Sequence, residues 1–237
     1  SNHEKLTTVY DIPDPENQQS TGTILKEQIN ADGQLDEEWG VPLFSDSTTD
    51  AGGSITDLSN LYLKHNNTHL FIGFGFGAGE WKGDDVHFCV ALDVKDGGTR
   101  QDPGLHPKVM WAGKNLPDHL VYLQTDSESI FSDKIVQGTL NTYNSSIDDW
   151  NSGVTITENN FAVSSELNFA ELILPLSSID LSSGGNFSIM IFSTEKGKPA
   201  AADSIPDDQY TDGSGNEDSW LTINTYLNLT IEDTGEV

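Results

Sequence analysis

The chain has 237 residues, of which 38 are acidic and 11 basic, so its formal net charge is −27. Eleven lysines and arginines make no basic patch, which argues against binding to a nucleic acid backbone or to an anionic membrane surface. No run approaches the roughly 18 apolar residues that a membrane-spanning helix needs, so no membrane insertion is expected. The negative charge favours partners that are neutral, cationic or metallic. A high net charge also keeps an extracellular protein soluble.

The order of polar and apolar segments along the sequence predicts one β-rich domain. Residues 1–22 are polar and read as a tail or linker, residues 23–232 as a single domain, and residues 233–237 as a C-terminal tail. Within the domain, short apolar runs alternate with clusters of Gly, Asn, Asp and Ser, which favours an all-β antiparallel sandwich of jelly-roll or immunoglobulin-like type with long Asp/Gly-rich loops. The clearest runs cover residues 61–63, 70–76, 86–94, 120–123, 161–167, 187–192 and 220–231.

Helical signals are few. Residues 36–40 are the best candidate for a short helix, and residues 168–181 could hold a helical turn that Pro175 would end. Cys89 is the single cysteine and lies inside an apolar run, so it is expected to be a core residue.

No sequence motif indicates an enzyme. The chain has no Gly-x-Ser-x-Gly elbow, no His-Glu-x-x-His and no P-loop. A glycosidase that uses two of the 38 acids stays open, because any acid pair in so acidic a chain has little specificity. Haem held by Met and His, such as Met190 and His87, is a weaker alternative, and no Cys-x-x-Cys-His is present for its covalent attachment.

Clustered aspartates in Gly-containing loops indicate a calcium site. Calcium takes six to eight oxygen ligands from carboxylates, carbonyls and water, so these loops suit it. Ordinary solvated turns are the alternative, and no segment has the spacing of an EF-hand loop. The candidate metal ligands are Asp84, Asp85, Asp93 and Asp96, which flank one predicted strand, and Asp203, Asp207 and Asp208 in a later loop.

Four aromatic residues stand in polar surroundings. A loop tryptophan exposes a flat apolar face on which a sugar ring can stack, and neighbouring Asp, Asn and Gln can bond to its hydroxyls. The alternative for each is that it folds back onto the edge of the sandwich. The candidate carbohydrate-binding residues are Trp81, Trp111, Trp150 and Tyr210, whereas Trp39 and Trp220 are expected in the core.

Three early segments carry a resemblance to known sandwich domains. Residues 29–39 read Ile-Asn-Ala-Asp-Gly-Gln-Leu-Asp-Glu-Glu-Trp, residues 61–72 form a Leu-Tyr-Leu to Leu-Phe-Ile hairpin around His-Asn-Asn-Thr-His, and residues 90–93 read Val-Ala-Leu-Asp. In this order they resemble the opening elements of family 9 carbohydrate-binding modules and DOMON-like domains.

Later segments narrow the resemblance. Residues 116–122 (Leu-Pro-Asp-His-Leu-Val-Tyr), 149–150 (Asp-Trp), 166–175 and 202–206 (Ala-Asp-Ser-Ile-Pro) follow in an order similar to the accessory sandwich domain of secreted pullulanases and amylopullulanases. The resemblance implies binding of starch, pullulan or maltooligosaccharides between aromatic faces, with calcium supporting the loops. It departs from those proteins in that this chain contains no catalytic domain.

The sequence therefore predicts a secreted, non-catalytic carbohydrate-binding module, with a polysaccharide or oligosaccharide and a glycoside hydrolase catalytic domain as its candidate partners. Glycosylation sequons at Asn66, Asn144, Asn186 and Asn228 fit secretion. The alternative is a structural or adhesion sandwich of a cell-surface protein with calcium-stabilised loops.

Overall fold

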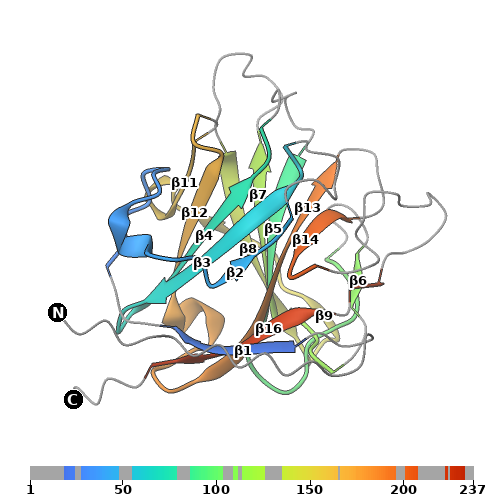
Figure 1. Ribbon diagram of the computed structural model, residues 1–237. Helices are drawn as coiled ribbons and strands as arrows, with labels where there is room; N and C mark the ends of the chain where they lie inside the picture. The colour runs from blue at the N-terminus through green and yellow to red at the C-terminus, as the bar shows by residue number, and fades with distance from the viewer. Residues whose placement is uncertain are drawn as a thin grey trace.

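Short β-strands account for more than half of the residues that the computed structural model describes (Figure 1). The described residues are 19–24, 28–47, 55–78, 86–103, 109–111, 114–125, 135–164, 166–195, 201–207, 222–223 and 225–232. Helical structure in these segments consists of single 3₁₀ turns, and no helix there is long and apolar enough to cross a membrane. The turns are η1 (Glu37–Trp39), η3 (Glu158–Asn160) and η4 (Leu176–Ile179).

The larger sheet, sheet A, is antiparallel except at one edge, where β1 runs parallel to β16. Its long strand β13 has two partners on one side, because residues 186–189 pair with β16 and residues 191–194 pair with β14. The strands follow the order β1 (Gln19–Ile24), β16 (Tyr226–Ile231), β13 (Asn186–Glu195), β5 (Val86–Asp93), β7 (His119–Thr125), β8 (Ile135–Asn144) and β10 (Val154–Ile156), with β14 (Ala201–Ile205) beside β13 and β9 (Asp149–Trp150) beside β8.

The smaller sheet, sheet B, packs face to face on sheet A, and its neighbouring strands all run antiparallel. Its order is β11 (Phe161–Ser164), β12 (Phe169–Pro175), β4 (His69–Phe76), β3 (Leu58–His65) and β2 (Phe44–Ser45). Two short strands, β6 (Met110–Trp111) and β15 (Thr222–Ile223), pair in parallel outside the two sheets.

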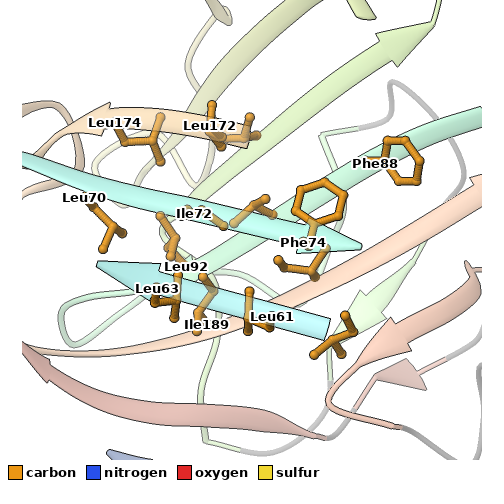
Figure 2. Packing of buried hydrophobic residues seen from close by; sticks show 14 of the residues in the cluster. Leu61, Leu63, Leu70, Ile72, Phe74, Phe88, Leu92, Leu172, Leu174 and Ile189 are labelled. Carbon is orange, nitrogen blue, oxygen red and sulfur yellow. The ribbon is translucent and has the colours of Figure 1, made fainter. Parts of the chain in front are cut away.

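Alternate side chains of both sheets meet in the main core. Figure 2 shows Leu61 and Ile72 of sheet B and Phe88 and Ile189 of sheet A within this cluster. The rings of Phe74 and Phe88 touch across the two sheets edge to face, with centroids 5.3 Å apart. Burial of this many apolar side chains is the main stabilising contribution to the fold.

The outer face of sheet A is also partly covered. Side chains of β5, β7, β13 and β16 that point away from the main core form a second cluster, which a segment containing Val109 and Trp111 covers. Strands buried on both faces need apolar residues at every position, which explains the continuous runs of the sequence. The outward-facing members are Cys89, Ala91, Leu120, Tyr122, Met190, Phe192 and Tyr226.

A buried glutamate closes the outer face of sheet B. Glu171 of β12 is fully buried, and its Oε2 accepts hydrogen bonds from the backbone N–H groups of Asp32 (2.8 Å) and Gly33 (2.5 Å). Its Oε1 accepts the indole N–H of Trp39 at 3.0 Å. A β-carbon on Gly73 would lie 3.0 Å from the Trp39 ring, so glycine leaves room for this packing. Residues 29–39 are thus a structural cover of sheet B.

These observations confirm the all-β antiparallel sandwich and correct it locally. Residues 19–22, assigned above to a tail, belong to β1 and pair with β16. Residues 169–175, which looked helical, form strand β12, because their side chains alternate between the main core and the outer face of sheet B. The predicted short helix at 36–40 is the single turn η1. Trp39 is buried as expected, and Trp220 lies outside the described residues.

Candidate functional site

Three aspartates meet where the two sheets approach one another. Asp46 follows β2 of sheet B, Asp203 lies in β14 of sheet A, and Asp207 follows β14. One carboxylate oxygen from each lies within 4.8 Å of the others. We call these three residues the acid triad; among the described residues, they are the group whose geometry suits a metal ion.

The triad holds its carboxylates close in spite of their charge. Asp203 is buried, and its Oδ2 accepts the backbone N–H of Leu58 at 2.5 Å, which ties β14 to the start of β3. Asp46 Oδ1 accepts the N–H of Ser47, while its Oδ2 is buried and has no donor in the described parts of the chain. Burial, together with the nearby carboxylates of Asp207 and Asp203, raises the pKa of Asp46 to about 9.

These properties are compatible with a bound cation, whose charge would offset the repulsion that now favours protonation of Asp46. The three residues supply carboxylate oxygens alone, which is the donor chemistry of hard cations such as Mg²⁺, Ca²⁺ and Mn²⁺. An ion bound there would join an edge of sheet B to β14 of sheet A.

The other predicted ligands in the described residues lie elsewhere. Asp93 ends β5 and faces the buried Asp118 instead of the acid triad, and Asp96 lies on the loop that follows β5. Asp118 Oδ2 accepts the backbone N–H groups of Val94 (3.0 Å) and Lys95 (3.1 Å) and so fixes the start of this loop. Asp84, Asp85 and Asp208 lie outside the described residues.

Trp111 does not present an open aromatic face. Its side chain is 4% exposed and packs on the outer face of sheet A, edge to face with Phe192 at 6.3 Å between ring centroids. The alternative of a folded-back tryptophan therefore describes this residue. Its indole nitrogen is buried and has no hydrogen-bond partner among the described residues. Trp81 and Tyr210 lie outside the described residues.

Trp150 lies on a hairpin at the edge of sheet A and is half-buried. Its indole N–H donates to the carbonyl of Gln101 at 2.8 Å, and its ring stands edge to face against Tyr143 at 5.9 Å between centroids. Tyr143 OH donates to Asp148 Oδ1 at 2.5 Å. Two such restraints fix the orientation of the indole while part of its surface stays open to solvent.

Amide and carboxylate groups surround this aromatic pair. Asn144 Nδ2 donates to Asn151 Oδ1 at 3.3 Å across the hairpin, and Asp148 occupies the turn with a positive φ of 54°. We call the set Tyr143, Asn144, Asp148, Trp150 and Asn151 the hairpin ledge. An oriented aromatic ring beside polar donors and acceptors can hold an apolar ring face and bond its substituents.

Sequence patterns missed several of these residues. Asp46 is distant from Asp203 along the chain and follows a two-residue strand with no loop signature. Tyr143 lies outside every predicted strand, and its pairing with Trp150 depends on the turn at 145–148. No protein-family model matches this chain, and no curated protein matches it significantly.

Proposed function

We propose that this chain is a secreted, non-catalytic carbohydrate-binding β-sandwich that recognises α-glucans such as starch, pullulan or maltooligosaccharides. The single observation that carries the proposal is the hairpin ledge, where Trp150 is held in one orientation and partly open beside Tyr143 and two asparagines. A pre-oriented ring loses little conformational entropy when a sugar stacks on it.

The acid triad supports a second part of the proposal, a calcium ion that stabilises the sandwich. Asp46, Asp203 and Asp207 would hold it through their carboxylates. The bound ion would supply fixed positive charge at this junction of β2 and β14. The ledge belongs to another region of sheet A, so calcium would act on the stability of the fold and not on sugar contact.

Calorimetric titration with maltoheptaose and pullulan tests the carbohydrate part. We expect Trp150→Ala to weaken binding by about 1–3 kcal/mol, the cost typical of losing a central aromatic anchor. The matched control is Leu167→Ala, because Leu167 is 53% exposed in the β11–β12 turn of the other sheet. Its affinity should equal that of the unmodified protein.

Two outcomes would contradict the carbohydrate part. Unchanged affinity in a folded Trp150→Ala protein would remove the ledge from the site. The absence of heat with every glucan, from protein that melts cooperatively with calcium present, would favour the structural or adhesion alternative.

The calcium part predicts proton release on binding. Since the ion favours the ionised form of Asp46, whose pKa is about 9 in its absence, calcium added at pH 7.5 should displace close to one proton. Calorimetry in two buffers of different ionisation enthalpy measures that number. Asp46→Asn should bind calcium more weakly and release none, whereas unchanged proton release by this variant would place the ion elsewhere.

A further inference from the structure

A polar cleft of about 420 Å³ opens on the outer face of sheet A, on a different set of residues from the hairpin ledge. Its floor is made by outward-facing residues of β13 and β16, and its walls are the loop at 93–97 and Lys114. The polar floor residues are Asn186, Ser188, Asn228 and Thr230. The volume lies within the range of about 300–1,000 Å³ that is typical of small-molecule sites.

A hydrogen-bond network orders the floor. Asn115 Nδ2 donates to Asn228 Oδ1 at 3.1 Å and also to Ser188 Oγ. Ser188 Oγ donates to Asn228 Oδ1 at 2.6 Å, and Thr230 Oγ1 donates to Asn186 Oδ1 at 2.6 Å. The carbonyl oxygens of both cleft asparagines are therefore occupied, whereas their amide nitrogens have no acceptor in the described structure. The floor presents fixed donors to whatever enters.

The charges of the walls balance. Lys95 and Lys114 contribute two ammonium groups, and Asp93 and Asp96 contribute two carboxyl groups. Lys95 is further tied to Asp180 at 2.5 Å. Although the chain as a whole has a net charge of −27, the cleft lining carries two basic and two acidic side chains, so it favours neither an anion nor a cation. Hydrogen-bond donors and acceptors lie next to one another in this lining, which suits the hydroxyl groups of a ligand.

We propose that this cleft is a second binding site, independent of the hairpin ledge, for a short uncharged polyhydroxylated ligand of one or two sugar residues. In the unglycosylated protein, the amide nitrogens of Asn186 and Asn228 donate to ligand hydroxyl oxygens, and the Thr230 hydroxyl lies among the same lining groups. Binding to the cleft and to the ledge by one longer glycan would raise the apparent affinity through the shared chain.

Maltose titration followed by ¹H–¹⁵N NMR tests the proposal, using protein made without glycosylation because Asn186 and Asn228 are both sequon residues. We expect the side-chain amide signals of these two asparagines to shift as maltose is added. Thr230→Val should lower the affinity at least threefold by removing one hydroxyl from a residue of the same shape. Thr155→Val, on exposed β10 of the same sheet, is the matched control and should change nothing.

The readouts separate this site from the proposed function. The indole N–H signal of Trp150 reports ligand binding at the hairpin ledge. Shifts confined to this signal would therefore overturn the proposal of a second site in the cleft, while leaving α-glucan binding at the ledge intact. Shifts of the asparagine amides alone would support the cleft and contradict the ledge. Amide shifts with glucuronate but none with maltose would overturn the uncharged class of ligand.

Discussion

A buried tryptophan covers the outer face of each sheet, but the two indole N–H groups differ in their hydrogen bonding. On sheet B, Trp39 packs over the strands and its indole N–H donates to Glu171 at 3.0 Å. On sheet A, Trp111 packs over the strands, but its indole nitrogen has no partner in the segments that the structure describes, and a cleft opens beside the cover. A fully satisfied cover serves stability, whereas an incompletely satisfied one leaves polar groups available to a ligand.

Removing the cover of sheet B should have the largest effect. Trp39→Ala deletes a side chain that is 1% exposed and leaves Glu171 Oε1 without its donor. We expect the free energy of unfolding to fall by about 3–5 kcal/mol, as for other buried tryptophans. Chemical denaturation monitored by circular dichroism measures this loss. A loss below 1 kcal/mol would mean that residues 29–39 contribute little to the fold.

A matched pair of smaller changes isolates the hydrogen bond. Trp39→Phe keeps much of the apolar volume but leaves a buried carboxylate oxygen unpaired, which should cost about 1–3 kcal/mol. Trp111→Phe removes an indole N–H that has no partner in the described part of the chain, so its cost should be smaller, below about 1 kcal/mol, from packing alone. The same denaturation experiment compares the two variants, and equal losses would contradict the difference between the two covers.

The carboxyl groups of the two faces should respond to neutralisation with opposite signs. Glu171 faces three N–H donors, so Glu171→Gln replaces an acceptor by a donor and should cost about 1–3 kcal/mol. Asp93 faces Asp118 instead, so Asp93→Asn should stabilise the protein by about 1 kcal/mol at pH 8.

The pH dependence follows from the pKa of Asp93, which folding raises from its ordinary value of 3.8 to about 7. The stability contributed by its protonated form is complete below pH 3.8 and is lost as the pH rises to about 7. Thermal melts between pH 4 and 8 should therefore show a smaller decline for Asp93→Asn than for the unmodified protein. Parallel curves would contradict the raised pKa.

The strands that sequence patterns predicted well are those buried on both faces. β5 and β13 carry apolar residues towards the main core and towards the outer cluster, so their runs are continuous. β8 escaped prediction because its Gln137, Thr139 and Asn141 look like loop residues, although Asn141 is 2% exposed and donates to the carbonyl of Leu120. β12 escaped because its buried Glu171 interrupts the apolar pattern of a strand.

The candidate sites were predictable only in part. Clustered aspartates pointed to Asp203 and Asp207, but the third member of the acid triad, Asp46, comes from the other sheet. Composition likewise cannot tell Trp111 from Trp150, since both stand in polar surroundings. Their difference depends on which tryptophan the chain lays across Phe192 and which it leaves on a hairpin.

The parallel pairing of β1 with β16 constrains the order in which the domain can assemble. Gln19 lies opposite Tyr226, so the earliest described strand has no partner until the last one is available. Other long-range ties have the same character, such as Leu58 to Asp203 across 145 positions and Gly33 to Glu171 across 138 positions. Contacts so distant in sequence close large loops, and domains that depend on them fold slowly. A chain that emerges N-terminus first therefore completes sheet A only after its synthesis has passed β16.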